Sequence, residues 1–546
     1  MAIKGKFFIF ITFFSIALAS LSCSNNQDLK EGFCTQGPQY KQNEIVNSPV
    51  LTSDWGNGLG NSRYQPMDRA GLSKEDIPQL KLKWAFKLPN TKAPRSQPAI
   101  TTDTVYVGGE KGHLFALDKS SGCIKWHRQF EDEVRTAMVI ADVSSKLRLL
   151  FFGDDNAVMH ALNAQTGEDV WHKKMDSHDS ALITAAPNYH QGRLYVSVSS
   201  LEVITALNPL YPCCTYRGSV AALDVKTGEI IWQTYTIAEE AGKTSKNKVG
   251  IQQWGPSGAP VWNTPAIDVK RNRLYVGTGE NYTTPATSLS DSVIAMDLDD
   301  GKIIWSKQLT SGDAWNMSCA APLKLSCPEK FGLDLDIGAA IMLLTRPDGE
   351  DILIAGQKSG KVFALNPETN GDIVWQQKLG RGGALGGVHW GMAADEQTVF
   401  VPISDMDLNM MIFNAKNPEG EKEPGLNAVD MATGKLKWRY QQTFTCKKPS
   451  DCDTGMSTPP TVMPGVVFAT NLDGEILAFS SEKGQLLWSY DTTQKVKTVS
   501  GEMAHGGTID VAGPVIAGGQ VFIQSGYKMG TGGSGNVFLS FSVDGK

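Results

Sequence analysis

The stretch SVAALDVKTGEIIW (Ser219–Trp232) holds a short apolar run, a polar turn and a second apolar run that ends in tryptophan. The first run carries alanine and leucine, which suit a strand with one face in a core. Asp224 and Gly228 favour a tight turn, because Asp caps its own backbone and Gly accepts unusual dihedral angles. Trp232 offers a large apolar surface for a neighbouring unit. The stretch therefore predicts a strand–turn–strand unit that docks through its tryptophan.

Seven stretches of the chain repeat this pattern, and consecutive terminal tryptophans are about 45 to 73 residues apart. That spacing suits one four-stranded blade of a β-propeller for each repeat, with loops added. Long helical periods are rare, whereas glycine (55) and tryptophan (13) are frequent, which favours an all-β chain. The repeats end at Trp126, Trp171, Trp232, Trp305, Trp375, Trp438 and Trp488.

The two ends of the chain predict how the ring closes. NVFLSFSVDGK, the last eleven residues, is the first half of an eighth unit without its tryptophan. LKLKWAF (80–86) carries Trp84 with no turn before it. We expect this N-terminal strand to complete the last blade, which leaves no open sheet edge. The fold class is thus predicted as an all-β, eight-bladed β-propeller of four-stranded antiparallel blades.

The N-terminus has the features of a targeting segment. Lys4 and Lys6 precede an apolar run, Phe7–Ala19, that is too short to span a bilayer comfortably. Ala17 and Ala19 offer a signal-peptidase site, and Cys23 offers the alternative of a lipid anchor. We predict a signal peptide at 1–22, a polar tether at 23–54 and the propeller at 55–546, in the periplasm or cell envelope.

Cysteine usage agrees with an oxidising compartment. If Cys23 is removed or lipidated, eight cysteines remain, which allow 105 connectivities. Cys319 with Cys327, and Cys446 with Cys452, are close enough in sequence to close small loops. Cys34 with Cys123 would then attach the tether to the body, which leaves the adjacent pair Cys213 and Cys214. No haem-attachment or zinc-type spacing occurs, and a net charge of −6 argues against a nucleic-acid binder.

The repeats, the count of eight blades and several particular stretches resemble the pyrroloquinoline quinone (PQQ)-dependent alcohol dehydrogenases, most closely the polyvinyl alcohol dehydrogenase-like branch. The similarity runs from Trp55 to the C-terminus. It implies an exported enzyme that oxidises an alcohol to a carbonyl with PQQ and Ca²⁺ and passes electrons to a separate soluble or membrane cytochrome c. The stretches are DWGNGLGNSRYQP (54–66), YPCCTYRGSVAALDVKTG (211–228), WGPSGAPVWNTPAID (254–268), DAWN (313–316) and GALGGVHWG (383–391).

Two alternatives stay open at this stage. The repeats alone also fit a non-enzymatic envelope lipoprotein propeller that scaffolds assembly, and such a protein would equally explain Cys23. A degenerate quinoprotein that binds PQQ but turns over poorly lies between the two. Trp262, Glu202 and Lys358, which the scaffold does not explain, favour the enzyme.

The resemblance implies specific contacts to PQQ, a flat ring system with three carboxylates. Trp262 would form the floor under the ring, and a Cys213–Cys214 disulfide would cover the opposite face. The same cysteines could instead stiffen a loop or pair elsewhere. Lys358 would hydrogen-bond the quinone oxygens and stabilise charge during reduction. Further cofactor contacts are implied for Arg135, Thr184 and Trp390, the last preceded by His389.

The resemblance also implies a calcium site and exposes a departure. Glu202 matches a calcium-binding glutamate, while Glu280 matches a second ligand by register and Asn281 by residue type. Related enzymes carry an aspartate base where this chain has Asn316, and an amide cannot take a proton. Asn316 could still bind Ca²⁺ or position the substrate. Asp313 is the nearest alternative base and Asp336 another, so the base stays unassigned.

Overall fold

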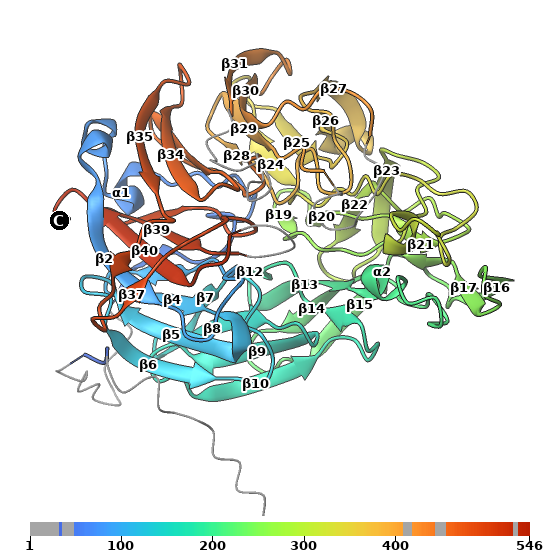
Figure 1. Ribbon diagram of the computed structural model, residues 1–546, viewed down its shortest axis with the longest axis horizontal. Helices are drawn as coiled ribbons and strands as arrows, with labels where there is room; N and C mark the ends of the chain where they lie inside the picture. Colours follow the sequence, from blue (N-terminus) through green and yellow to red (C-terminus); the bar gives the residue numbers. More distant parts are fainter. Residues whose placement is uncertain (1–31, 35–47, 408–417, 443–454, 528–532, 546) are drawn as a thin grey trace, which may run out of the picture.

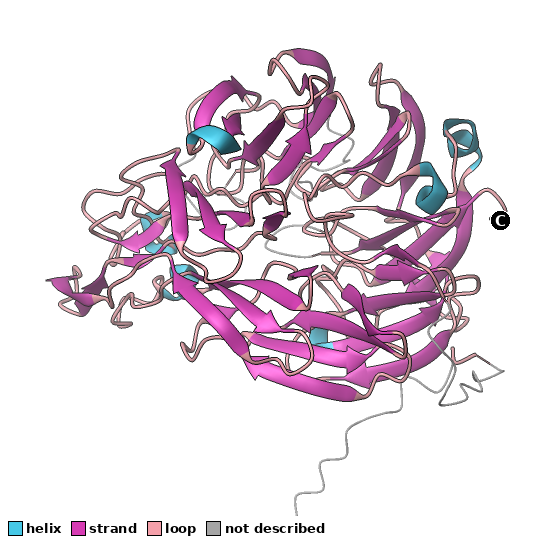
Figure 2. Cartoon of the chain, turned by 180° about the vertical axis from the view of Figure 1, so that it is seen from behind, coloured by secondary structure: helices cyan, strands magenta, loops and turns pink. Residues whose placement is uncertain are grey.

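The computed structural model describes residues 32–34, 48–407, 418–442, 455–527 and 533–545, which form eight small antiparallel sheets arranged as a ring (Figures 1 and 2). The predicted signal peptide, the anchor at Cys23, most of the tether and the Cys446–Cys452 pair lie outside these residues. Among the described residues, none of the helices has the length and apolar character needed to cross a membrane.

Each sheet is one blade, and within a blade successive strands pair side by side. The first blade gains β1 as a fifth strand, and β12 adds to the third. The strands of blades one to four are β1 (Val50–Thr52), β3 (Ala99–Thr101), β4 (Thr104–Gly108), β5 (His113–Asp118) and β6 (Ile124–Gln129); β7 (Val139–Ser144), β8 (Leu147–Gly153), β9 (Val158–Asn163) and β10 (Asp169–Lys174); β11 (Ala181–Leu182), β12 (Asn188–His190), β13 (Arg193–Ser200), β14 (Ser219–Asp224) and β15 (Ile230–Tyr235); β19 (Ala266–Asp268), β20 (Arg273–Gly277), β22 (Ser292–Asp297) and β23 (Ile303–Gln308).

Blades five to eight follow the same plan. Their strands are β24 (Met342–Thr345), β25 (Asp351–Gly356), β26 (Lys361–Asn366) and β27 (Asp372–Lys378); β28 (Ala393–Ala394), β29 (Thr398–Ile403), β30 (Gly425–Asp430) and β31 (Leu436–Gln441); β32 (Thr461–Met463), β33 (Val466–Thr470), β34 (Glu475–Ser480) and β35 (Leu486–Asp491); β38 (Val515–Ala517), β39 (Gln520–Ser525), β40 (Val537–Ser542) and β2 (Lys81–Lys87).

The remaining elements lie in the connections between strands. Three short hairpins or bridges are β16 (Gly242–Lys246) with β17 (Gln252–Gly255), β18 (Ser257–Gly258) with β21 (Asn281–Thr283), and β36 (Val496–Lys497) with β37 (Met503–Ala504). The helices are α1 (Met67–Ala70) and α2 (Glu202–Thr205), with 3₁₀ turns at η2 (Lys74–Gln79), η3 (Glu110–Gly112), η4 (Met317–Cys319) and η5 (Pro367–Thr369).

The ring closes as the sequence predicted. Strand β2, from the N-terminal part of the chain, pairs antiparallel with β40, and Trp84 lies opposite Ser540. Figure 1 shows the blue β2 beside the red β40 and β39. The eight-bladed count and the closure by the N-terminal strand are therefore confirmed, and this closure pairs a strand edge that would otherwise be open.

The repeat tryptophans dock neighbouring blades. Trp171 shows the arrangement, since its indole Nε1 donates to Val225 O in the next blade and its ring packs on Gly228. A Cβ at Gly228 would lie 2.6 Å from the indole, and its φ of +71° also favours glycine. Seven tryptophans donate to the next blade in this way over 2.9 to 3.1 Å: Trp84, Trp126, Trp171, Trp232, Trp375, Trp438 and Trp488.

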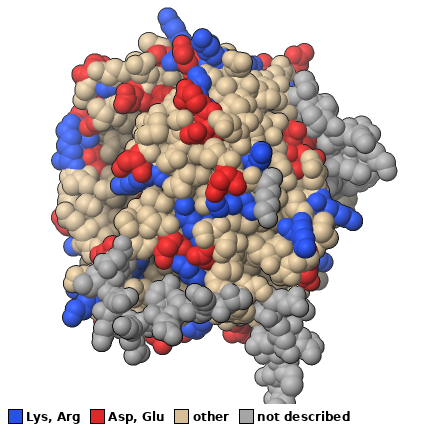
Figure 3. Space-filling model, turned by 90° about the vertical axis from the view of Figure 1, so that its left-hand side faces the viewer, with Lys and Arg blue, Asp and Glu red and all other residues tan. Residues whose placement is uncertain are grey.

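The core lies between blades rather than in one central mass. Val220 and Ala222 of β14 pack with Ile294 and Met296 of β22, which joins blades three and four. Disulfides join Cys34 to Cys123, Cys213 to Cys214 and Cys319 to Cys327, as the cysteine pattern predicted. Acidic and basic side chains are interspersed over the face shown in Figure 3.

Candidate active site

A cavity of about 1080 Å³, counted to its mouth, opens among the loops that connect the blades. Its wall brings together residues that are far apart in sequence, from Arg135, just before β7, to Tyr527 in the last blade. Seven of the residues predicted for the site line it: Arg135, Thr184, Trp262, Glu280, Asp336, Lys358 and Trp390.

A buried cluster of charges occupies one part of the wall. Lys358 Nζ donates to Asp334 Oδ1 over 2.8 Å and to Asp336 Oδ2 over 2.9 Å. Asp336 Oδ1 accepts from the backbone N–H of Glu280 over 2.9 Å. The carboxylate oxygens of Glu280, Asp334 and Asp336 lie within 4.8 Å of one another. Three carboxylates therefore face one ammonium in a region sheltered from water.

This imbalance perturbs every member of the cluster. Burial, followed by the neighbouring Asp336, raises the pKa of Glu280 well above its ordinary value, and burial likewise raises that of Asp334. Asp336 is also desolvated, but Lys358 outweighs that effect and lowers its pKa to about 2. Burial alone would lower the pKa of Lys358, yet the attraction of Asp334 and Asp336 raises it. A cation bound among these carboxylates would therefore reduce their mutual repulsion.

Trp262 contacts this cluster and also lines the cavity. Its Nε1 donates to Asp336 Oδ2 over 3.1 Å, and Lys358 Nζ is 5.3 Å from its ring centroid. Trp390 packs edge-to-face against it with ring centroids 5.2 Å apart. Gly338 lies against the ring so closely that a Cβ there would overlap it. The indole is therefore fixed in place by hydrogen bonding and packing.

His389 also lines the cavity but has structural contacts. Its Nδ1 lies 3.1 Å from Ser457 Oγ, and its ring packs edge-to-face on Trp262. Burial, with Lys358 nearby, lowers its pKa to about 3, so the imidazole is neutral at ordinary pH.

Arg135 and Thr184 line both this cavity and a second one of about 430 Å³, whose wall also includes Trp262 and Trp390. Among the described residues, the buried Nε of Arg135 has no hydrogen-bond partner. Burial, and then the nearby Arg95, lowers the pKa of Arg135 to about 10. Arg95 itself is paired with Glu133. A guanidinium left with an unsatisfied donor favours an anionic ligand in the adjoining cavity.

The structure does not bring Asp313, Asn316 or Asn281 to the cavity wall. Asp313 accepts hydrogen bonds from the backbone N–H groups of Asp334 (3.4 Å) and Leu335 (3.0 Å), so it supports the loop that carries the charged cluster. Asn316 donates to Tyr282 O and Ser326 O and caps η4 through Ser318 N. Asn281 donates to Ser257 O and accepts from Thr287. All three side chains are occupied by local structure.

Glu202 and the adjacent cysteines lie behind the cavity wall. Both oxygens of Glu202 accept hydrogen bonds from the loop that follows the cysteines, through Thr215 N and Tyr216 N, and Tyr211 Oη also donates to it. Cys213 and Cys214 are fully buried in a cluster that includes Tyr282, which does line the cavity. Glu202 begins α2, and its neighbours Leu201, Val203 and Ile204 form an apolar part of the wall.

Sequence reasoning missed several residues of this wall. Asp334 lies two residues before Asp336 in GLDLDIG. In an extended chain, side chains two residues apart point to the same side, so this spacing could have indicated that Asp334 faces the cavity together with Asp336. In and directly after the DAWN stretch, Trp315 and Met317 alternate with Ala314 and Asn316. Trp315 and Met317 line the cavity, whereas the predicted Asn316 does not. Asp510 and Tyr527, from the last blade, carry no local motif.

Two family models match the chain. The model described as "Glucose/ethanol/alcohol dehydrogenase, beta-propeller domain" matches residues 53–378. The model for outer membrane protein assembly factor BamB matches residues 358–527.

Individual proteins of known name or structure are also similar. Polyvinylalcohol dehydrogenase from a Pseudomonas species is 37% identical over 515 residues, which cover 92% of this chain and 78% of that one. Polyvinylalcohol dehydrogenase from a Sphingopyxis species is 37% identical over 510 residues, covering 90% and 76%. The crystal structure of quinohemoprotein alcohol dehydrogenase from Comamonas testosteroni superimposes with a TM-score of 0.66 at 19% identity, covering 91% and 81%.

Proposed function

This chain belongs to the PQQ-dependent alcohol dehydrogenase family, and from that premise we propose that PQQ and Ca²⁺ bind in the cavity beside Trp262. The observation that carries this proposal is one cavity lined both by an unsatisfied guanidinium, Arg135, and by the Lys358 cluster. No scaffold function requires either feature. The physiological substrate would be an alcohol that reaches the cavity from outside the cytoplasm.

The residues present suit PQQ. A flat aromatic ring system needs an aromatic surface, and Trp262 is held rigidly enough to supply one. Its carboxylates need donors, which Arg135 and Thr184 offer. Its quinone oxygens need a cation, which Lys358 offers. The vicinal disulfide Cys213–Cys214 supports the wall through Tyr282 rather than lining the cavity, so its proposed part is to stiffen the site.

The residues also suit a calcium ion. Calcium prefers several oxygen ligands, and Glu280, Asp334 and Asp336 provide three carboxylates at close range. A divalent cation would offset the excess negative charge that now raises the pKa of Glu280 and Asp334. We propose these three as the primary ligands. Glu202 and Asn281, the other candidates, would have to give up existing hydrogen bonds to join them.

When bound, PQQ supplies a quinone that accepts a hydride equivalent from the alcohol carbon, and Ca²⁺ supplies Lewis acidity. The protein contributes charge and shape. The Lys358 ammonium would supply positive charge beside the quinone and so favour its reduction. The protein would also supply a carboxylate to take the hydroxyl proton: Asp313 lies off the wall and Asn316 is an amide, whereas Asp510 and the three proposed calcium ligands Glu280, Asp334 and Asp336 line the cavity.

The wall suggests a substrate with an extended carbon chain. Leu201, Val203, Ile204, Trp315 and Met317 give one part of the cavity an apolar surface. A neighbouring groove of about 1360 Å³ shares Trp315, Ala384 and Met406 with the cavity. We propose secondary hydroxyl groups along such a chain as the substrate class, which agrees with the names of the two polyvinylalcohol dehydrogenases.

The proposal extends to location and partner. Three disulfides fit an oxidising compartment, so we propose export by the N-terminal segment, with lipidation at Cys23 as an optional anchor. The chain carries no CxxCH haem-attachment motif, so electrons would leave to a separate cytochrome c. The rival assembly scaffold rests on the match to the BamB model over residues 358–527.

The test is reconstitution of the purified chain with PQQ and Ca²⁺, followed by dye-linked oxidation of polyvinyl alcohol, a small secondary alcohol and a primary alcohol. The expected result is turnover that needs both PQQ and Ca²⁺ and favours the secondary alcohols. Turnover of none of the three would contradict the enzyme. PQQ binding without turnover would instead support the degenerate-binder alternative, and no binding would favour the scaffold.

A further inference from the structure

Three loops beside the cavity share an unusual composition. They are residues 203–211, which follow α2, residues 241–255, which include the β16–β17 hairpin, and residues 315–328, which include η4. Together they contain four lysines and no aspartate or glutamate; Glu239, Glu240 and Glu329 stand directly outside these ranges. We call the three loops the tri-loop surface. Its lysines are Lys243, Lys246, Lys248 and Lys324.

Hydrogen bonds tie the three loops into one surface. Asn247 Nδ2 donates to Pro209 O over 2.7 Å and to Ser326 Oγ over 3.1 Å, so the hairpin tip bridges the other two loops. Lys248 N donates to Leu325 O, and its Nζ donates to Leu323 O. The Cys319–Cys327 disulfide closes the third loop. The surface is therefore held in one arrangement before any partner arrives, which reduces the entropy cost of binding.

Large apolar side chains project from this surface among the lysines. Leu210 is 70% exposed and Leu323 is 71% exposed, far more than a packed loop requires. Val249 and Leu207 are 47% and 41% exposed. Because Asn247 bonds the residue before Leu210, and Lys248 bonds the carbonyl of Leu323, the apolar groups lie close together. An exposed apolar patch with a polar rim is typical of an interaction site.

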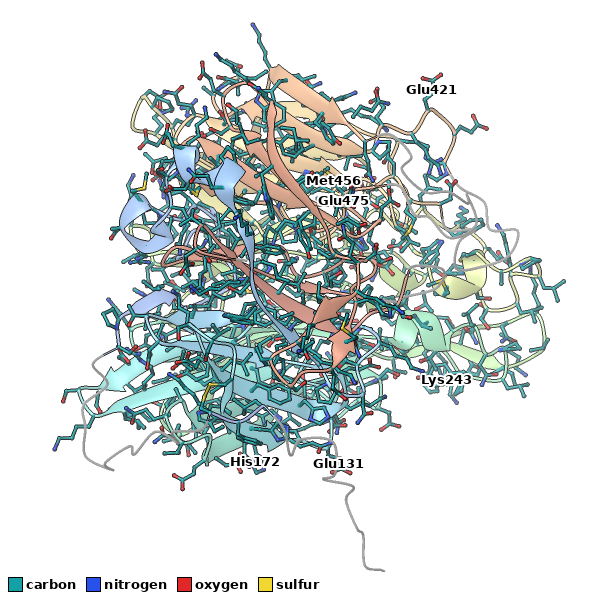
Figure 4. The ribbon with its side chains drawn as sticks, turned by 60° about the vertical axis from the view of Figure 1, so that its left-hand side comes forward. Glu131, His172, Lys243, Glu421, Met456 and Glu475 are labelled. Carbon is teal, nitrogen blue, oxygen red and sulfur yellow. A yellow bond between two sulfur atoms is a disulfide. The ribbon has the colours of Figure 1, made fainter. Side chains whose placement is uncertain are left out.

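The same loops form part of the cavity wall. Val203 and Ile204 line the cavity on the segment that continues to Leu207 and Leu210. Trp315 and Met317 line it on the segment that continues to Leu323. The hairpin projects from the ring beside α2 in Figure 1, and Figure 4 labels Lys243 on it. A molecule docked on the tri-loop surface would lie against the wall of the oxidation site.

We propose that the tri-loop surface docks an acidic one-electron haem protein whose apolar haem edge meets Leu210, Val249 and Leu323 while its carboxylates meet the lysines. This rests on the proposed function. Oxidation of one alcohol to a carbonyl releases two electrons and two protons, and two molecules of the oxidised haem protein each take one electron. Charge complementarity favours an acidic partner and a fast, salt-sensitive encounter.

The first test measures binding without cofactor. Native equine cytochrome c is basic, and the same protein with succinylated lysines is acidic, so the two probes differ mainly in charge. The unloaded chain should bind the succinylated form at least about 10-fold more tightly than the native form at low salt. Raising the salt to about 0.2 M should weaken that binding. Equal affinity for the two forms would overturn the proposal.

The second test compares matched variants. Lys243→Glu with Lys246→Glu should weaken binding of succinylated cytochrome c about 10-fold and slow its reduction by the loaded enzyme, with dye-linked turnover unchanged. Leu210→Ser with Leu323→Ser should weaken binding of succinylated cytochrome c without changing how that binding depends on salt concentration. The control, Lys146→Glu with Lys495→Glu, changes net charge equally at exposed positions outside the tri-loop surface and should have no effect.

The outcomes separate this proposal from the proposed function. If the control variant weakens binding as much as Lys243→Glu with Lys246→Glu, charge alone is responsible and the docking surface is wrong. Preferential binding of the native chain to anionic lipid vesicles over succinylated cytochrome c would likewise overturn it. If the native enzyme loaded with PQQ and Ca²⁺ shows no dye-linked turnover, the proposed function is wrong, whether or not either cytochrome c binds.

Discussion

The Nζ atom of Lys358 lies 2.8 Å from Oδ1 of Asp334, and both side chains are almost wholly buried in the wall of the cavity. A buried ammonium of this kind is stable only while carboxylates surround it. Its partners, however, exceed it in charge, because Asp336 and Glu280 belong to the same cluster. One ammonium and three carboxylates therefore share this buried part of the wall.

Replacing Lys358 should remove that positive charge. Lys358→Met is expected to lower the kcat of dye-linked alcohol oxidation by about 100-fold or more, since the developing oxyanion loses its stabilising cation. Loss of one partner of a buried ion pair should also lower the free energy of unfolding by about 3–5 kcal/mol. Lys358→Arg, the control, keeps the charge and should keep most activity. An unchanged kcat in Lys358→Met would remove Lys358 from the mechanism.

Gly338 offers a way to displace Trp262 without touching any charge. In Gly338→Ala the new methyl group would overlap the indole, so the ring must shift. We expect weaker PQQ binding, measured by tryptophan fluorescence, in a protein whose far-ultraviolet circular dichroism is unchanged. Gly242→Ala is the matched control, because a Cβ there has only Gly255 O within 4 Å, at 3.9 Å. Equal PQQ affinity in the two variants would argue against Trp262 as the floor.

Arg135 should have opposite effects on stability and on binding. Its Nε has no partner among the described residues, so Arg135→Leu is expected to raise the melting temperature of the unloaded protein. The same change should weaken PQQ binding by about 10- to 100-fold, through loss of a charge-assisted hydrogen bond. Calorimetry gives the first value and fluorescence titration the second. Unaltered PQQ affinity would mean that the guanidinium does not meet a cofactor carboxylate.

Variants of Glu202 and Glu280 test which of these two glutamates binds calcium. Glu202→Gln should lower stability, because Thr215 N and Tyr216 N lose a charged acceptor, and should leave the Ca²⁺ dependence of activity unchanged. Glu280→Gln should weaken Ca²⁺ binding at least about 10-fold. Isothermal titration with Ca²⁺ in the presence of PQQ checks both. A larger loss of Ca²⁺ affinity in Glu202→Gln would restore Glu202 as the ligand implied by the resemblance.

The histidine pair in the first blade makes a prediction about pH. His113 Nδ1 lies 3.0 Å from His127 Nε2, and burial, with His113 nearby, lowers the pKa of His127 to about 4 from 6.5. The unfolded chain therefore takes up its proton first as pH falls below 6.5. Stability should drop between about pH 6.5 and 4, and His127→Phe should reduce that drop in urea denaturation curves. An identical pH dependence in the variant would contradict this.

The sequence predicted the ring because its repeats are local. Each Asp/Asn turn and each terminal tryptophan acts within one blade and its neighbour, so the pattern around Trp232 is readable without the rest of the chain. Closure by Trp84 followed from counting units, and β2 does pair with β40. The adjacent cysteines were paired by elimination, and their disulfide is present.

The cavity was harder to predict because loops from many blades meet there. The resemblance led to Trp262, Glu280 and Lys358, which line the cavity, and to Asn281 and Asn316, whose side chains local hydrogen bonds hold elsewhere. Residue type alone could not distinguish cavity residues from loop residues, because an asparagine side chain can either bind a ligand or stabilise a loop by hydrogen bonds. Asp334 was missed because its role depends on Lys358, 24 residues later in the chain.

The central claim is tested most directly by equilibrium titration of the purified chain with PQQ, with and without Ca²⁺. The account predicts one PQQ bound per chain at micromolar concentration, tighter binding when Ca²⁺ is present, and loss of that Ca²⁺ effect in Glu280→Gln. Absence of PQQ binding at micromolar concentration, with Ca²⁺ present and the chain folded, would contradict it.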